Sequence, residues 1–240
     1  MAILPIDSGR YGTKEMLEIF GEQKKVDYQL QIEAAAALSQ SEINLIPKSI
    51  AKDIAKAARS GKITAKRIKQ LEAKSDHDTA ALVESLAERC KKESRPWIHY
   101  GLTSNDLVDT SNSMQMRDAI KVIQPKVGKL ALLLSKNAVK YKVLPAVGRT
   151  HGQHASIISF GLKFANWASE MATHLERLDE IKKRILICKT LGVVGTGSLM
   201  GKDAVKVQER VAKKLLLFPA KVTTQIIPRE RYAEYIFQLS

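Results

Sequence analysis

Cysteine, proline, glycine and aromatic residues are all scarce in this sequence of 240 residues, which holds 2 Cys, 7 Pro, 13 Gly and 5% aromatics. Two cysteines cannot form a disulfide framework, and such low usage suits a reducing compartment, so we expect a cytoplasmic protein. No run of about 18 apolar residues occurs, so no helix is expected to span a membrane. With 45% hydrophobic and 27% charged residues, the composition indicates a globular chain rather than a disordered one.

Negative charge is also in short supply, because 39 lysines and arginines outnumber 25 aspartates and glutamates, which gives a net charge of +14. Such an excess fits a nucleic-acid surface, a solvated lysine-rich exterior or a pocket for a polyanionic small molecule. The lysines between residues 52 and 74 are spread along expected helix faces without interleaved aromatics. This pattern favours a solvated exterior and argues against nucleic acid as a partner.

Helical patterns cover most of the chain. Shorter helices are expected at residues 15–39, 49–59, 64–74, 78–93 and 203–217, with another from 229 onward. Thr64 and Asp76 are expected to cap the helices that follow them. Two longer runs, 105–141 and 156–189, have apolar residues in steps of three and four, which predicts a heptad seam, and Pro125 should kink the first run. The seam residues are Met116, Ile120, Ile123, Val127, Leu130 and Leu134, then Ile157, Gly161, Phe164, Ala168, Met171, Leu175, Leu178 and Ile185. The small residues Gly161 and Ala168 among them should let a neighbouring helix approach closely.

Loops are expected at residues 142–155 and 190–202, and only 220–227 has the pattern of a strand. The fold class is therefore all-α, with a smaller N-terminal helical domain at 1–104 and a long-helix bundle domain at 105–240. Helices of more than thirty residues exceed the usual length and need long partners from this chain or from other subunits. The last helix has no terminating glycine or proline, so we expect that the sequence is cut short within the bundle.

Two imidazoles, a cation and a hydroxyl lie close together in the loop between the long runs, where Arg149, Thr150 and His151 are followed by His154. Histidine suits proton transfer because its unperturbed pKa lies nearest neutrality. Taken alone, the segment also fits a polar loop with incidental histidines. A metal site would need further Cys, Asp or Glu ligands at a suitable spacing, which the segment lacks.

Polar residues also mark several helix starts. Thr103 and Ser104 open the first long run, where hydroxyls and freed backbone N–H groups can either bind an anion or only cap the helix. His77 could contact a phosphate with Asp78 orienting its ring, or it could be solvated beside capping aspartates. The glycines at 195–201 have the wrong spacing for a Rossmann loop, although a turn near an anionic substrate stays open.

These segments, in this order, resemble the fumarase/aspartase superfamily of β-elimination lyases. The motifs that carry the resemblance are Arg10-Tyr11, His77-Asp78, Gly101-Leu102-Thr103-Ser104-Asn105-Asp106, Arg149-Thr150-His151-Gly152, Leu191-Gly192-Val193-Val194-Gly195-Thr196, and Thr224-Gln225 with Arg229-Glu230-Arg231. The His-Asp pair and the Gln-to-Arg segment point to the branch of this superfamily that acts on adenylosuccinate. The resemblance covers essentially the whole chain.

The resemblance implies a lyase of purine biosynthesis that splits adenylosuccinate into AMP and fumarate and acts likewise on the succinylcarboxamide ribotide. It assigns His151 as general acid, and His77 as an assisting catalytic residue that holds the phosphate together with Arg10. The residues it assigns to substrate binding are Arg10, Tyr11, Asp76, His77, Asp78, Thr103, Ser104, Thr150, Gln225 and Arg229. It implies no metal and no organic cofactor, and a homotetramer with active sites shared between subunits.

One family feature is missing, because the family's catalytic base is a serine in a mobile loop with paired serines followed by Met-Pro, and no such run occurs here. We therefore expect that the chain stops before this loop, and that residues 1–240 alone are a poor enzyme. Two alternatives stay open. The chain could be another lyase of the superfamily, acting on argininosuccinate or a carboxymuconate, or a basic helical binding module without catalysis.

Overall fold

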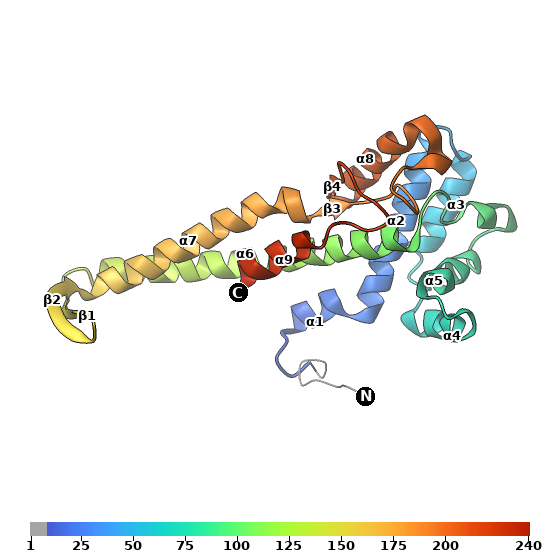
Figure 1. Ribbon diagram of the computed structural model, residues 1–240. Coiled ribbons are helices and arrows are strands. Elements are labelled where there is room, and N and C mark those ends of the chain that lie inside the picture. Colours follow the sequence, from blue (N-terminus) through green and yellow to red (C-terminus); the bar gives the residue numbers. More distant parts are fainter. Residues whose placement is uncertain (1–8) are drawn as a thin grey trace. The chain divides into compact units, whose positions relative to one another are not determined.

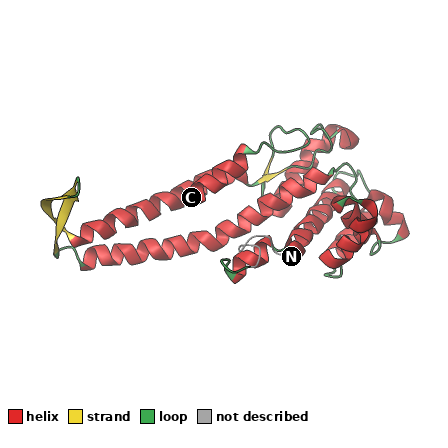
Figure 2. Cartoon of the chain, turned by 60° about the horizontal axis from the view of Figure 1, so that its bottom comes forward, coloured by secondary structure: helices red, strands yellow, loops and turns green. Residues whose placement is uncertain are grey.

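A computed structural model describes residues 9–240 of the chain, which fold into two compact units. The first unit comprises residues 9–118 and 183–232, and the second comprises 119–182 and 233–240. Helices predominate in both, as Figure 2 shows, so the predicted all-α fold class is confirmed. The predicted domain boundary at residue 104 falls at the start of the longest helix, and the division into 1–104 and 105–240 stays a prediction.

The first unit is built around α2 (Glu22–Ser41), which Figure 1 labels. This helix is buried over most of its length. Its small residues Ala34–Ala37 allow close packing of α3 (Lys48–Ala58) and α8 (Ala204–Leu215) against it. The prediction of one continuous helix over 15–39 is wrong, because two helices cover this range. α1 (Lys14–Phe20) ends at Gly21, where extended backbone (ψ 153°) separates it from α2.

Two short helices follow, α4 (Ala65–Ser75) and α5 (Asp78–Ala87), which pack against each other. Thr64 caps α4 as predicted, since its side chain accepts the N–H of Arg67. Asp76, however, ends α4 in a left-handed conformation (φ 52°) instead of capping the next helix. The cap of α5 is His77, which is discussed below with the site.

One short helix near residue 95 and several elements late in the chain complete the first unit. A short 3-10 helix, η2 (Lys92–Trp97), lies where we expected the end of α5, and η3 (Ser198–Asp203) interrupts the expected loop at 190–202. β3 (Ile187–Cys188) pairs in parallel with β4 (Phe218–Pro219). The predicted strand at 220–227 is wrong, because this segment has no strand partner and is anchored by side chains instead.

The long helices are confirmed. α6 (Ser104–Lys140) has 37 residues and remains helical through Pro125, and α7 (Phe160–Ile185) has 26. In the second unit they run side by side (Figures 1 and 2), and Gln124 of α6 donates to Asp179 of α7 at 2.8 Å. Their approach is close at Gly161, where an added Cβ would lie 2.4 Å from the Ala138 carbonyl, so the predicted role of this small residue is confirmed. α9 (Glu230–Leu239) is the last helix.

The connection between these helices is not the expected loop but an antiparallel hairpin of β1 (Pro145–Thr150) and β2 (Gln153–Ser159). Its turn is formed by His151 and Gly152, both with positive φ (50° and 73°), as a tight hairpin turn requires. Ile157, predicted as a seam residue of the second helix, lies in β2 and is exposed.

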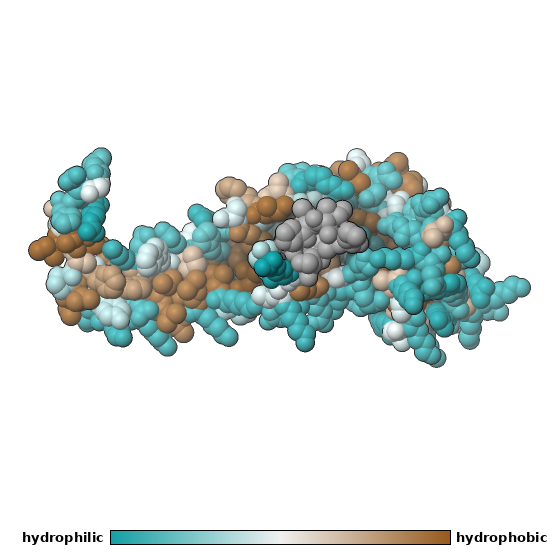
Figure 3. Space-filling model, turned by 90° about the horizontal axis from the view of Figure 1, so that it is seen from below, coloured by the Kyte–Doolittle hydropathy of each residue, from teal (hydrophilic) through white to brown (hydrophobic). Residues whose placement is uncertain are grey.

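The predicted seam residues of α6 differ in how far they are buried. Met116 and Ile120 are buried, whereas Leu130 is exposed. Apolar residues exposed in the second unit include Leu132, Leu133, Val139, Val143, Leu162, Trp167, Ile236 and Phe237. Figure 3 shows such apolar side chains along the two long helices on the face in view. None of the helices within residues 9–240 combines the length and hydrophobicity needed to cross a membrane.

Candidate active site

The start of α6 is the turn for which the sequence leaves open either an anion site or simple capping of the helix. Asp106, at the third helical position, reaches back and accepts the Thr103 N–H through Oδ2 at 3.0 Å. This is one half of a capping box. The Thr103 N–H, which we expected to be available to an anion, is thus occupied. Helix geometry leaves the N–H groups of Ser104 and Asn105 without intrahelical acceptors, so these are the donors that can meet an anion.

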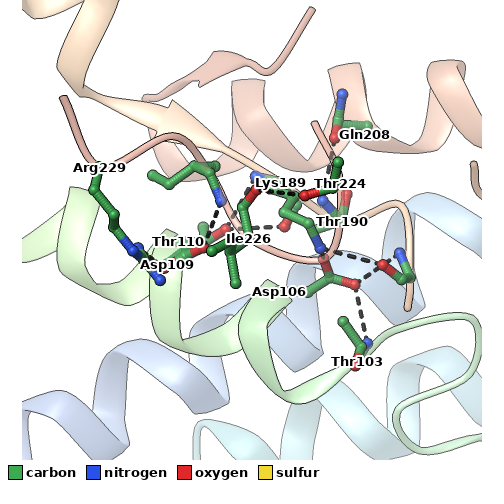
Figure 4. Close-up of polar contacts among 12 residues, drawn as sticks. Thr103, Asp106, Asp109, Thr110, Lys189, Thr190, Gln208, Thr224, Ile226 and Arg229 are labelled. Carbon is green, nitrogen blue, oxygen red and sulfur yellow. Dashed lines mark hydrogen bonds and ion pairs between the residues drawn. The ribbon is translucent and has the colours of Figure 1, made fainter. Parts of the chain in front are cut away.

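Asp106 also forms a fully buried ion pair with Lys189, 83 residues further along the chain (Figure 4). Its Oδ1 contacts Lys189 Nζ, while its Oδ2 accepts a second N–H, from Gly192, at 2.9 Å. Lys189 Nζ additionally donates to the Gly192 carbonyl at 3.2 Å. Burial raises the pKa of the Asp106 carboxyl, and the charge of Lys189 together with both N–H donors opposes that rise. The pair thereby joins the turn before α6 to residues 190–202, which we call the glycine-rich loop.

A second set of contacts fixes the backbone on either side of Lys189. The Thr110 hydroxyl accepts the Lys189 N–H at 3.1 Å and donates to the Lys189 carbonyl at 3.0 Å. Gln208, buried on α8, accepts the Thr190 N–H at 3.1 Å and donates to the Ala220 carbonyl at 2.8 Å. The start of the glycine-rich loop is therefore held between α6 and α8.

Asp109, one turn further along α6, anchors a third segment of the first unit. It is fully buried and accepts the Ile227 N–H (2.8 Å), an Arg229 guanidinium N–H (2.7 Å) and the Tyr232 hydroxyl (3.2 Å). The predicted substrate residue Arg229 is thus partly committed to Asp109, and 49% of its side chain remains exposed. Gln225, just before this anchor, is exposed.

The nucleotide-side residues predicted near the N-terminus make local contacts. The guanidinium of Arg10 lies 5.8 Å from the ring centre of Tyr11, and both side chains are exposed. His77 Nδ1 accepts the Ala80 N–H at 3.3 Å and lies 3.6 Å from Asp78 Oδ1, with about half of each side chain exposed (54%). Asp78 Oδ1 accepts the Thr79 N–H at 2.6 Å, so these contacts are those of a helix cap, and the role of Asp78 in orienting the His77 ring stays a prediction.

Thr150 and His151 belong to the hairpin of the second unit. His151 occupies the turn, exposed to solvent, and its left-handed conformation is one that histidine tolerates better than most residues. An open cavity of about 530 Å³ lies beside the turn, lined by Arg149, Thr150, Lys163 and neighbouring residues. Arg149 contacts His154 across the strands at 3.3 Å. The hairpin therefore presents the His151 imidazole to solvent at its turn, with Arg149 directed to His154.

Sequence reasoning missed Lys189, Asp109 and Gln208, which hold the loops in place. Lys189 had a visible signal, because it is a lone charge in the mostly apolar run 185–191 and such a charge needs a buried partner. Nothing local to Asp109 reveals its role, since its partners lie about 120 residues away. No group of three or more potential metal ligands occurs within residues 9–240.

The described residues form an all-α scaffold. Polar turns are held by buried side chains around the start of α6, a helix of 37 residues. The chain belongs to a family described as "Lyase", whose profile matches residues 9–240. Two solved structures share the fold. They are a fumarate lyase from a Mesorhizobium species (TM-score 0.88, 30% identity, 95% of this chain and 55% of that one) and a β-carboxy-cis,cis-muconate cycloisomerase from Acinetobacter calcoaceticus (TM-score 0.87, 29%, 95% and 54%).

Curated relatives narrow the resemblance to adenylosuccinate lyases. The adenylosuccinate lyase of Methanocaldococcus jannaschii is 43% identical over 240 residues, which is 100% of this chain and 52% of the relative. Those of Methanothermobacter thermautotrophicus and Pyrococcus horikoshii are 39% and 38% identical, again over 100% of this chain and 53% of each relative. The chain thus spans about half the length of the curated relatives it matches.

Proposed function

We propose that this chain is part of an enzyme that eliminates fumarate from adenylosuccinate to give AMP, and from the succinylcarboxamide ribotide in the same way. The observation that carries the proposal is identity of 43% to an adenylosuccinate lyase along the whole chain, with the nucleotide-side pair His77 and Asp78 in contact. The proposal includes a place in purine biosynthesis and in the cytoplasm.

The elimination needs three chemical roles. A base removes the proton from the succinyl carbon next to a carboxylate, the electron pair forms the C=C bond of fumarate, and the C–N bond breaks. Negative charge develops on the carboxylate, where the N–H groups of Ser104 and Asn105 at the positive end of α6 would stabilise it, with the hydroxyls of Thr103 and Ser104 nearby. The departing nitrogen takes a proton from the general acid, for which we propose His151.

On the nucleotide side, Arg10 and His77 would hold the phosphate, with Asp78 keeping the imidazole oriented. Tyr11 would offer an aromatic face, and the exposed Gln225 would contact the substrate near the bond that breaks. Asp76, Thr150 and Arg229 complete the proposed substrate-binding set.

We further propose a homotetramer whose subunits share active sites. The exposed apolar side chains of the second unit support it, because Leu132, Val139 and Phe237 are 56%, 66% and 81% exposed, and such surfaces mark interfaces. Sedimentation of the protein as its gene encodes it should give four copies. A monomer at micromolar concentration would contradict this part of the proposal.

The function is tested by incubating that protein with adenylosuccinate and measuring AMP and fumarate. His151→Gln should lower kcat by about two to four orders of magnitude, as expected for loss of a general acid, with KM less affected. An unchanged kcat would refute the role of His151.

Another lyase of the superfamily is the second candidate, favoured by the similar TM-score of the muconate cycloisomerase. His77→Ala separates the two. The substitution should weaken binding of a nucleotide substrate strongly and leave a phosphate-free substrate unaffected. A basic binding module would instead bind DNA or RNA with steep salt dependence and would not bind AMP.

A further inference from the structure

We infer that Asp106, neutralised by Lys189, is a positioning residue that sets the distance between the carboxylate-binding start of α6 and the glycine-rich loop. This inference rests on the proposed function for its substrate. It concerns two residues that cannot contact the substrate themselves, because both side chains are completely buried.

The side chains of Asp106 and Lys189 form hydrogen bonds with backbone groups of two separate loops, the turn before α6 and the glycine-rich loop. A single oxygen, Asp106 Oδ2, accepts one N–H from Thr103 and one from Gly192, at 3.0 and 2.9 Å. Lys189 Nζ then donates to the carbonyl of the same Gly192. A shift of either loop would therefore break a hydrogen bond inside a dry site, where an unpaired polar group is costly.

Close backbone contacts show how tightly this spacing is set. A Cβ added to Gly192, which has a φ of 77°, would lie 3.1 Å from the Gly101 carbonyl oxygen. Further along the loop, a Cβ on Gly195 would lie 2.2 Å from the Thr223 carbonyl oxygen. The loop thus touches the turn before α6 at one end and the segment that leads to Gln225 at the other.

A small cavity lies between the two loops that Asp106 joins. It has a volume of about 50 Å³ and is lined by Gly101, Leu102, Gly192, Thr196 and neighbouring loop residues. A single water needs about 10–15 Å³ of such space, so the cavity is on the scale of a few atoms. Its size depends on the distance between the loops, which the Asp106 contacts determine.

Charge alone does not explain why such a pair is present, because buried ion pairs often add little net stability compared with apolar residues of similar size. If the pair serves to position the two loops, removing its charges has a different expected effect than if it serves to stabilise the fold. Removing both charges should be tolerated as long as an oxygen remains at residue 106 to accept the two N–H groups.

The test uses two double variants of the protein as its gene encodes it. Asp106→Asn with Lys189→Met removes both charges and keeps an amide oxygen as acceptor. Asp106→Leu with Lys189→Met removes the acceptor as well. For each, inhibition of adenylosuccinate cleavage by fumarate and by AMP is measured separately, along with the thermal midpoint.

We expect the Asn-containing variant to keep both inhibition constants within about threefold. The Leu-containing variant should bind fumarate at least about tenfold more weakly while its AMP constant changes less than about twofold. Because that variant could fail to fold, Gly192→Ala provides a second route, since its methyl group would push the loop from Gly101 while both residues of the ion pair are kept. It should show the same selective loss of fumarate binding.

Tyr28→Phe is the matched control, because it deletes a hydrogen bond from Tyr28 to Asp118 (2.7 Å) in the same unit, away from the proposed site. It should lower the thermal midpoint and leave both constants unchanged. Unchanged fumarate binding in the Leu-containing variant and in Gly192→Ala would overturn the inference, as would a parallel loss of AMP binding. A wild-type protein that neither cleaves adenylosuccinate nor binds AMP would instead refute the proposed function.

Discussion

Replacing Lys189 alone by methionine would leave the Asp106 carboxylate buried without its counter-ion. Both side chains of the wild-type pair are 0% exposed, so bulk solvent does not screen the charge of the carboxylate. Breaking such a pair costs about 3–5 kcal/mol. Since a domain's stability is about 5–15 kcal/mol, the loss is a large share of the total. For a chain of this size, each kcal/mol lowers the melting temperature by about 2–4 °C, which predicts a fall of roughly 6–20 °C.

The same variant should show a characteristic pH dependence. Removal of Lys189 deletes an influence that lowers the pKa of Asp106, so the folded-state pKa rises further above the unfolded value. A raised carboxyl pKa makes the folded state bind the proton more tightly. Its contribution to stability is therefore present below the unfolded pKa of about 3.9 and is lost as the pH rises through the folded pKa. The deficit relative to wild type should thus be larger at pH 7 than at pH 5.

Urea unfolding of both proteins at the two pH values gives these free energies directly. Asp106→Asn added to Lys189→Met should recover most of the lost stability, because no buried charge then remains. A loss below about 1 kcal/mol for Lys189→Met at pH 7, which is the scale of an exposed ion pair, would refute the claim that the pair is buried and closed.

Three further predictions follow from other buried contacts. Burial lowers the pKa of His99, but the hydrogen bond (2.6 Å) and the charge of Glu33 outweigh it, so the pKa is raised. The contribution of protonated His99 to stability is present below the ordinary pKa of about 6.5 and is lost as the pH rises through the raised value. His99→Gln should therefore make the melting temperature vary less with pH between these two values. Asp109→Ala should cost about 3 kcal/mol in urea unfolding and speed amide exchange in the segment before α9, and unchanged exchange would contradict the anchoring. Gly195→Ala should lower the melting temperature by several degrees because its Cβ would overlap the Thr223 carbonyl; an unshifted melting curve would contradict this close approach.

The long helices could be predicted because a heptad pattern is a local property of the sequence. The steps through Met116, Ile120 and Ile123 locate α6 to within a residue at each end, and Gly161 correctly indicated a close approach. Thr64 was predictable as a cap for the same reason, since capping involves the next three residues only.

The hairpin was missed because its turn does not contain the usual Asn-Gly or Asp-Gly pair. His151 takes the left-handed position ahead of Gly152, and a single exposed histidine gives little sign of that conformation. The cap of α5 was misassigned for a related reason, because Asp76 takes the left-handed position at the end of α4 and leaves His77 to cap the next helix.

The proposed site residues could be named from motifs, but the contacts that hold them could not. Asp106 lies inside a recognised motif, yet its partner Lys189 is 83 residues away, and no spacing rule links them. The same holds for Asp109 and the segment around Arg229. Motifs predict which groups face a substrate, whereas tertiary structure determines which buried residues hold the backbone between them.

The most direct test of the account is the reaction itself, measured on the protein as its gene encodes it. Adenylosuccinate should be converted into equal amounts of AMP and fumarate, while argininosuccinate and carboxymuconate substrates should not be turned over at a comparable rate. Absence of both products, or equal turnover of a phosphate-free substrate, would contradict the proposed function.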